Sequence, residues 1–200
     1  MQYVLLFAAC LAACLLNAQT DYAARRVQYQ QAFLTNPRSP LTAADTALLD
    51  FYPPQPQWAV VAKIVRTPDS PAFGLPTYSG QERPYRQYGI LYFEIAGKPY
   101  RLCVYQNMKL AQDTAHQDHL FLPFKDHTNG ESTYGGGRYL DLHSADIRAD
   151  DTLLLDFNLC YNPWCAFSDG YNCPIPPPVN ELDLAVEAGE KVFRGAHKHK

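Results

Sequence analysis

Two polar segments in the second half of the chain hold the residue types that could do chemistry. Residues 126–141 contain carboxylates, hydroxyls and Arg138 around three consecutive glycines, and residues 156–173 add amides, aromatic rings and cysteines. A guanidinium can hold an anionic group through paired hydrogen bonds, and aromatic side chains commonly line small-molecule sites. We therefore predict that the two segments are loops that converge on a pocket for a small polar or anionic molecule.

The predicted ligand contacts divide by their chemistry. Arg138 would hold an anionic or hydroxyl-bearing group, Asn158 and Asn162 would supply hydrogen-bond donors and acceptors, and tyrosine and tryptophan rings would form the walls. The full predicted set is Asp126, Thr133, Tyr134, Arg138, Tyr139, Asp156, Asn158, Tyr161, Asn162 and Trp164.

A hydrolase that acts on envelope or sugar substrates is the alternative. General acid and base catalysis needs two carboxyl groups at a fixed separation. The candidates for that pair are Asp126, Glu131, Asp141 and Asp156, and the distance between Asp126 and Asp156 is the first to check. Cys165 is a candidate nucleophile with His127 or His143 as its base, although such a thiolate needs a nearby cation and a reducing compartment. A third hypothesis is that the polar pattern is structural and only holds long loops together.

Neither a cofactor nor a metal ion is expected. Gly135–Gly137 is followed by Arg138 rather than by the lysine and hydroxyl of a phosphate-binding loop, so the glycines are predicted to make a turn or a close backbone approach. The cysteine spacing lacks the C-x2-C pairs of structural zinc sites, and His116-x2-His119 has no matched partner. Residues 197–200, His-Lys-His-Lys, are predicted to be a solvated tail.

Cysteine use indicates an oxidising compartment. Of six cysteines, all but Cys10 and Cys14 lie beyond the N-terminal region. The predicted disulfide joins Cys165 and Cys173, because it would close a loop rich in glycine, asparagine and aspartate and stabilise it by about 2 to 3 kcal/mol. The pairing of the other two cysteines, Cys103 and Cys160, stays open, because the sequence does not choose among the connectivities.

The N-terminus predicts export. Residues 1–18 carry no charged side chain, and the apolar run of residues 4–16 is shorter than the about 20 residues that cross a bilayer. Such a run is typical of a secretory signal, so we predict a periplasmic or secreted protein cleaved after Ala18. In the alternative, a lipobox ending at Cys14 would make the chain an outer-membrane or surface lipoprotein. Only then is membrane contact expected.

Charge and length limit the function classes. The chain has 17 Lys+Arg residues, 20 Asp+Glu residues and a formal net charge of −3. Because nucleic-acid binding depends on a concentrated basic surface and these basic residues are dispersed, no nucleic-acid partner is expected. We predict a signal peptide at residues 1–18, a helical lead-in at residues 19–50 and one β-rich domain at residues 51–200.

The lead-in contains two helix patterns. The first begins at Asp21, a suitable N-cap, and runs to about Thr35, where an Asn-Pro pair ends it. In the second, Thr42 and Asp45 form a capping-box pattern before a short helix that stops at the Tyr52-Pro-Pro run.

From Trp58 onward the apolar pattern changes from helical to strand-like. The clearest element is a hairpin of residues 90–95 and 100–105 around a turn at Ala96-Gly97-Lys98. Further strands are predicted at residues 58–65, 119–124, 138–142, 152–157 and 182–187. Short strands joined by glycine, proline and asparagine turns favour a mainly β fold, with an antiparallel sheet in a sandwich or partial barrel.

Several segments together resemble the family of domain of unknown function 1684. The resemblance covers most of the chain, from about Tyr52 to Phe193, and rests on residues 85–91, 120–126, 133–141, 156–158, 161–163, 165–166, 173–174, 176–180 and 188–191. It implies an exported bacterial protein without a settled activity. It also implies that the polar residues belong to the family's own pattern, namely Asp126, Thr133, Tyr134, Arg138, Asp156, Asn158, Tyr161, Asn162, Cys165 and Cys173.

Overall fold

The structure is a computed structural model that describes residues 22–199. The chain divides into two compact units, Met1–Ala47 and Leu48–Lys200. The predicted signal peptide lies outside the described residues, so export and cleavage stay predictions. Within residues 22–199, no helix has the length and apolar character needed to cross a membrane.

The N-terminal unit is helical. One helix covers residues 22–35 and ends before the Asn36-Pro37 pair, since proline disfavours the helical conformation in the residue that precedes it. The second helix, α2 (Ala43–Thr46), begins after Thr42, whose hydroxyl accepts a hydrogen bond from the Asp45 N–H. The Asp45 carboxylate accepts in return from the Thr42 N–H at 2.7 Å. This is the predicted capping box.

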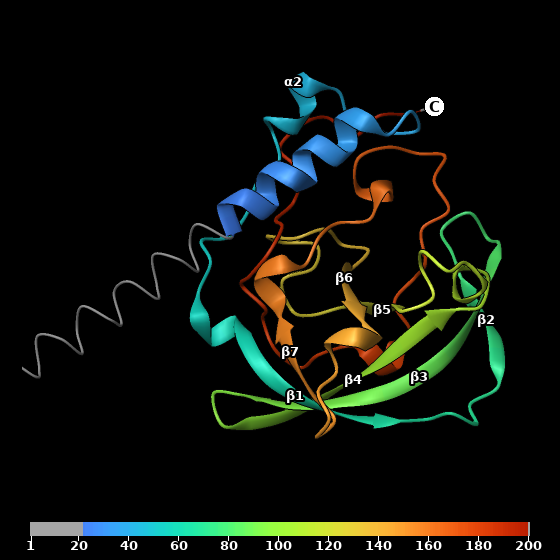
Figure 1. Ribbon diagram of the computed structural model, residues 1–200. Coiled ribbons are helices and arrows are strands. Elements are labelled where there is room, and N and C mark those ends of the chain that lie inside the picture. Colours follow the sequence, from blue (N-terminus) through green and yellow to red (C-terminus); the bar gives the residue numbers. More distant parts are fainter. Residues whose placement is uncertain (1–21, 200) are drawn as a thin grey trace, which may run out of the picture. The chain divides into compact units, whose positions relative to one another are not determined.

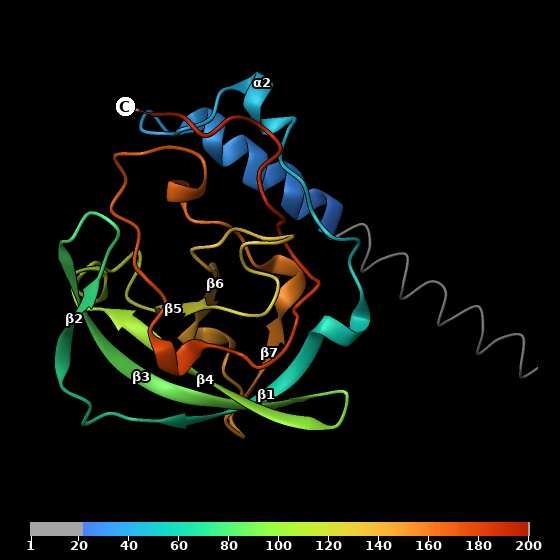
Figure 2. The same ribbon diagram turned by 180° about the vertical axis from the view of Figure 1, so that it is seen from behind.

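The second unit is built on one antiparallel sheet with the strand order β6-β5-β4-β3-β1-β7, and β2 pairs with β3 beside this path. The strands are β1 (Ala59–Arg66), β2 (Ala72–Pro76), β3 (Glu82–Ile95), β4 (Lys98–Asn107), β5 (His119–Phe124), β6 (Arg138–His143) and β7 (Thr152–Asp156). Figures 1 and 2 show that the sheet curls, with β3 and β4 as long bent strands. The predicted mainly β fold, an antiparallel sheet in a partial barrel after a short helical lead-in, is confirmed.

The central hairpin follows the sequence pattern. β3 ends at Ile95 and β4 begins at Lys98, and both connecting residues, Ala96 and Gly97, have positive φ, as a type I′ turn requires. The predicted strand at residues 119–124 coincides with β5. β2 has no counterpart among the predicted strands.

A β-bulge between Gln87 and Gly89 changes which face of the sheet the side chains of β3 occupy. One extra residue in a strand reverses the alternation, so Tyr85 lies on the face opposite to Leu91. Gly89 permits this close approach, because a Cβ atom there would lie 2.8 Å from the Val65 carbonyl oxygen.

The two faces of the sheet bury two apolar clusters. The larger cluster combines residues of β1 and β3 to β7 with residues of the segments that follow β7, among them Phe157, Cys160, Leu182, Val186 and Ala188. The smaller cluster lies on the other face of β3 to β6 and consists of Leu75, Tyr85, Cys103, Tyr105, Phe121 and Tyr139. Both faces of β5 and of residues 102–107 of β4 are therefore buried.

Residues 182–187 do not form the predicted strand. Leu182 and Leu184 each make one backbone hydrogen bond, to Lys125 and His127, just beyond the end of β5. At Val186 side chains replace the strand partner: its N–H donates to the Asp126 carboxylate at 3.1 Å, and its carbonyl accepts from Arg138 at 2.8 Å. The apolar residues of the segment still pack into the larger cluster. Burial of these side chains was predictable, but the irregular backbone was not.

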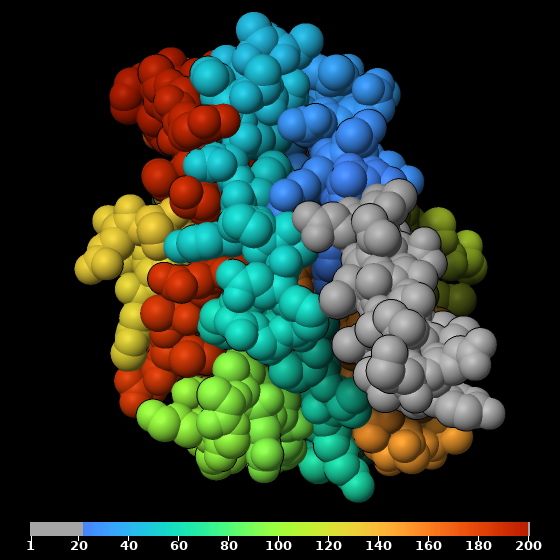
Figure 3. All heavy atoms as spheres, turned by 90° about the vertical axis from the view of Figure 1, so that its left-hand side faces the viewer, coloured from blue at the N-terminus to red at the C-terminus, as the bar shows by residue number. Residues whose placement is uncertain are grey.

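The C-terminal segment closes the second unit against its own beginning. Lys191 donates its N–H to the Asp50 carbonyl at 2.9 Å, and Tyr52 donates its N–H to the Gly189 carbonyl at 2.9 Å. In the space-filling view of Figure 3 these two segments, red and cyan, lie side by side at the surface. The end of the chain is thus held by backbone hydrogen bonds.

Candidate functional site

The predicted ligand contacts occupy two kinds of place in the structure. Most are buried, namely Asp126, Thr133, Arg138, Tyr139, Asp156, Asn158 and Asn162. Three are partly exposed, namely Tyr134, Tyr161 and Trp164. The buried members and the exposed members therefore have to be considered separately.

Arg138 opens β6 and is fully buried, with an exposed fraction of 0%. Its Nη2 donates to the Asp126 carboxylate at 2.9 Å and to the Val186 carbonyl at 2.8 Å. Its Nη1 donates to the carbonyls of Ala188 and Glu190. The guanidinium thus joins the sheet to the C-terminal segment, whereas the sequence predicts that it faces a ligand.

The charge of Arg138 is kept in the interior by its surroundings. Burial opposes the cation, but Cys160 and the Asp126 carboxylate raise the pKa of Arg138 above its ordinary value. The Phe124 ring also lies 5.5 Å from the guanidinium carbon, within the range of a cation–π contact. Of the three nitrogen atoms of the Arg138 guanidinium, only Nε has no hydrogen-bond partner among the described residues.

Asp126 organises the loop that precedes β6. Its Oδ1 accepts from the Thr128 N–H at 2.9 Å and from the Thr128 hydroxyl at 2.6 Å, while the Asn129 amide oxygen accepts from the Asp126 N–H at 2.7 Å. The Asn129 amide also donates to the Thr133 hydroxyl and to the Tyr134 carbonyl. Side chains that bind the backbone polar groups of their own loop in this way take the place of the hydrogen bonds of a regular turn.

Asp156, Asn158 and Asn162 also make hydrogen bonds within the chain that hold its loops in place. The Asp156 carboxylate accepts from the Asn158 N–H at 3.0 Å and caps a short 3-10 helix, Phe157–Leu159. The Asn158 amide pairs with both backbone groups of Gln55, and the Asn162 N–H donates to the Glu190 carboxylate at 2.7 Å. Because Asp126 and Asp156 both accept internal hydrogen bonds, the geometry gives no support to a catalytic carboxylate pair.

Cys165 and Cys173 lie together, as the sequence predicts, but both carry free thiols, so the predicted disulfide is not formed in the structure. The Cys165 N–H donates to the Cys173 sulfur at 3.2 Å. A hydrogen bond between the two thiols lowers the pKa of Cys165 to about 7 and raises the pKa of Cys173. The Cys165 sulfur also lies 3.3 Å from the Tyr171 carbonyl oxygen, a contact that favours the protonated thiol.

The position of Cys173 is set by the β2 side of the sheet. Tyr78 donates its N–H to the Cys173 carbonyl at 3.1 Å, and Thr77 forms an isolated antiparallel bridge with Pro174. The Tyr139 hydroxyl donates to the Pro174 carbonyl from the other side. Cys173 is buried and Cys165 is partly exposed, so one thiol of the pair is accessible to solvent.

The three consecutive glycines make a turn and a close approach, as predicted. Gly137 has a φ of +91°, and a Cβ atom on Gly136 would lie 2.3 Å from the Tyr134 ring and 2.4 Å from the Tyr78 hydroxyl. That hydroxyl donates to the Gly136 carbonyl at 3.0 Å. Desolvation by burial raises the pKa of both tyrosines, and the neighbouring Cys165 contributes to the rise.

The loops of residues 126–141 and 156–173 do meet. Tyr139 and Tyr161 exchange both backbone hydrogen bonds, at 2.9 and 3.0 Å, and Tyr134 acts electrostatically on the thiols. We call the surface formed by Cys165, Cys173, Tyr78 and Tyr134 the dithiol site. Tyr78 is not among the predicted ligand contacts, because it lies in a short turn far from both loops in the sequence.

Two cavities elsewhere contain none of the predicted residues. Both open beside the start of β4, where Pro99 and Tyr100 line each of them. Their volumes are about 550 Å³ and 500 Å³. They are not linked to the loops that the sequence singled out.

A second polar cluster also went unpredicted. The Asp141 carboxylate accepts from the Tyr161 hydroxyl at 2.9 Å, and its other oxygen lies 2.9 Å from His119 Nε2. Burial and the adjacent carboxylate raise the pKa of Tyr161 well above its ordinary value. This hydrogen bond ties Tyr161 to β6, so Tyr161 is less available to a ligand than the sequence implies.

Comparisons with known proteins agree with the resemblance in sequence. A family described as a protein of unknown function (DUF1684) matches residues 45–191. The solution structure of an uncharacterised protein of Haloarcula marismortui is similar, with 30% identity and a TM-score of 0.69, covering 90% of this chain and 96% of that chain. A search of curated proteins found no match.

Proposed function

We propose a function for this chain, which belongs to the DUF1684 family of proteins of unknown function, from its dithiol site. The chain is an exported protein that binds a small polar or anionic ligand where the loops of residues 126–141 and 156–173 meet. The ligand is a low-molecular-weight disulfide, and the two cysteines exchange with it. Cell fractionation and N-terminal sequencing test the export part of this proposal.

The observation that carries the proposal is the hydrogen-bonded pair of thiols, of which one is accessible. Cys165 is partly exposed and has a pKa of about 7, so a large share of it is thiolate at neutral pH. The thiolate is the form that attacks a disulfide, and a thiol whose pKa is near the ambient pH is the most effective attacker. The exposed Arg83 lies close enough to act electrostatically on Cys173 and would favour an anionic ligand.

The reaction is a two-step thiol–disulfide exchange. In the first step the Cys165 thiolate attacks one sulfur of the ligand, which forms a mixed disulfide and releases one ligand thiol. In the second step Cys173 loses its proton and attacks the Cys165 sulfur, which releases the second ligand thiol. The protein loses two electrons to the ligand disulfide and ends with a Cys165–Cys173 bond, the pairing that the sequence predicts.

Trapping the mixed disulfide tests this order of events. With oxidised glutathione as the probe, the Cys173→Ala variant should accumulate one glutathione adduct on Cys165, because the resolving thiol is missing. The wild-type protein should instead gain an internal disulfide. Intact-mass spectrometry followed by peptide mapping distinguishes the two products.

The matched control is Cys165→Ala, which leaves only the buried Cys173 and should form no adduct. Cys103 and Cys160 are buried in the structure and serve as internal controls in every variant. An adduct on Cys173 in the control, or a wild-type pair that stays reduced, would contradict the proposal. A folded state for each variant is checked by circular dichroism.

The pH dependence of alkylation tests the role of Cys173 separately. In the wild-type protein, the initial rate of Cys165 alkylation by iodoacetamide should rise with an apparent pKa of about 7. Loss of the Cys173 hydrogen bond in Cys173→Ala removes the main effect that stabilises the thiolate, so the apparent pKa should rise toward the ordinary thiol value of about 8.5. Equal values in the two proteins would exclude this coupling.

A permanent structural disulfide is the competing account of the same cysteines. Structural disulfides typically have reduction potentials below about −300 mV, whereas exchanging pairs lie between about −270 and −120 mV. Equilibration of the wild-type protein in glutathione or dithiothreitol buffers of known potential gives this value directly. A potential in the lower range would mean that the bond only stabilises the loop.

A further inference from the structure

Residues 197–199 are not a free tail, although the side chains of His197 and His199 are exposed. Lys198 forms a parallel bridge with Ser168: its N–H donates to the Phe167 carbonyl at 2.9 Å, and its carbonyl accepts from the Asp169 N–H at 2.9 Å. The buried Phe167 ring contacts the Phe193 ring at 5.2 Å, which anchors the same segment. The prediction of a solvated tail is therefore wrong for the backbone.

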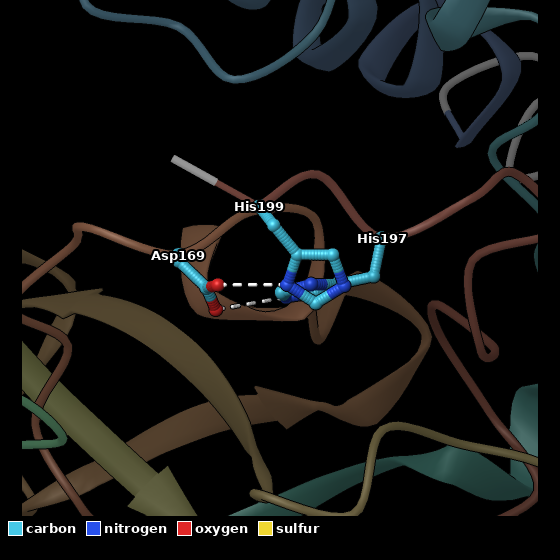
Figure 4. Close-up of side chains that lie close together, drawn as sticks. All are labelled: Asp169, His197 and His199. Atoms are coloured by element: carbon cyan, nitrogen blue, oxygen red, sulfur yellow. Dashed lines mark hydrogen bonds and ion pairs between the residues drawn. The ribbon is translucent and has the colours of Figure 1, made fainter.

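The bridge determines where the two histidines point. In extended backbone, successive side chains alternate between opposite sides, so His197 and His199 lie on one side and Lys198 on the other. Figure 4 shows both imidazole rings turned toward Asp169, and their centroids are 5.2 Å apart. Hydrogen bonds of the backbone, rather than the histidines themselves, bring these three side chains together.

We propose that Asp169, His197 and His199 bind one divalent transition-metal ion, with zinc as the representative ion. Each side chain offers one ligand atom, and these atoms all lie within 4.8 Å of one another. His199 Nδ1 is 2.9 Å from one carboxylate oxygen of Asp169, and His197 Nε2 is 3.9 Å from the other. Ligand atoms that surround one zinc ion, each about 2.0 to 2.1 Å from it, lie at similar distances from one another. Small side-chain rotations would therefore be enough to place all three ligand atoms around the ion.

The ligand types determine the class of ion. Two imidazoles and one carboxylate suit zinc, copper or nickel rather than calcium or magnesium, which prefer oxygen ligands. Three protein ligands leave at least one position for water or another molecule, as in zinc sites that are not purely structural. The carboxylate offsets part of the charge of the ion.

Binding has two local costs. The proton shared by His199 Nδ1 and the Asp169 carboxylate must leave, because both atoms become ligands of the ion. His197 Nε2 lies 3.2 Å from the Cys165 carbonyl oxygen, and this contact must be given up when the nitrogen turns to the ion. The metal site is therefore adjacent to the loop that carries Cys165. The proposal does not depend on thiol exchange, because none of its ligands is a cysteine.

Isothermal titration calorimetry with Zn²⁺ as the only added ligand tests the site. The titration uses the full chain without an affinity tag and with Cys165 and Cys173 both changed to serine, so that thiols cannot supply the binding. We expect one saturable site in this background. The His197→Ala/His199→Ala variant and the Asp169→Asn variant should each weaken it by at least about tenfold.

His116→Ala is the matched control, because His116 is also exposed and lies 2.8 Å from a carboxylate, that of Asp113. It should leave the affinity for Zn²⁺ unchanged. No saturable binding, an unchanged affinity in the double histidine variant, or an equal loss in the control would each overturn the proposal. A visible absorption spectrum with Co²⁺ that lacks thiolate bands is expected with the wild-type ligands. Circular dichroism confirms that each variant is folded.

Discussion

Replacing Arg138 by methionine should lower the free energy of unfolding by about 3 to 5 kcal/mol, the cost of removing one partner from a buried ion pair. Both Arg138 and Asp126 have side chains with 0% exposure, and they are joined at 2.9 Å. The substitution leaves the Asp126 carboxylate without its cation and removes the guanidinium as a donor to the carbonyls of Val186 and Ala188, each of which keeps one weaker or neutral donor. Because a domain is stable by only about 5 to 15 kcal/mol, this loss is large.

Equilibrium unfolding in urea, followed by circular dichroism, measures the effect. The matched control is Arg101→Met in the exposed first part of β4, which should change stability by no more than about 0.5 kcal/mol. A second variant separates charge from packing: Asp126→Asn together with Arg138→Met removes the unpaired carboxylate and should recover part of the loss. A stable, unperturbed Arg138→Met protein that had lost only ligand binding would instead support the predicted ligand contact.

The elements that the sequence predicts well are those whose signals are local. The hairpin of β3 and β4 follows from alternating apolar residues on both sides of Ala96-Gly97, and the capping box at Thr42 is contained within four neighbouring residues. The run at residues 182–187 alternates in a similar way but forms no strand. The backbone groups of Val186 are bound by Asp126 and Arg138, which are far away in the sequence, so no local pattern could indicate this.

The sequence was enough to predict where the candidate site lies, but not which of its residues would face a ligand. The sequence indicates that the loops of residues 126–141 and 156–173 meet and that Cys165 lies near Cys173. It does not indicate that Arg138 points inward, because that depends on three segments folding together around one guanidinium. The residues next to Arg138 in the sequence do not show whether its side chain is buried in the fold or faces a ligand.

Replacing Asn180 by leucine should lower the free energy of unfolding by about 3 kcal/mol or more, because the side chain substitutes for a missing part of the sheet. β4 and β5 pair at Tyr105 and Phe121, so Cys103 and Pro123 are the next facing residues. Pro123 has no N–H to donate, and the Asn180 amide lies between the two strands. It accepts from the Cys103 N–H at 2.8 Å and donates to the carbonyls of Cys103 and Pro123 at 2.8 and 2.7 Å.

Leucine has a similar volume but no polar atoms, so Asn180→Leu would leave one N–H and two carbonyls unpaired in the interior, at about 1 to 3 kcal/mol each. Urea unfolding measures the total, and amide hydrogen exchange at Cys103 measures the local effect, since that N–H loses its acceptor. Asn172→Leu is the control, because the Asn172 amide bonds Gln81 at the exposed surface and should cost under about 1 kcal/mol. Equal stability losses in the two variants, with no faster exchange at Cys103, would show that the amide does not complete the sheet.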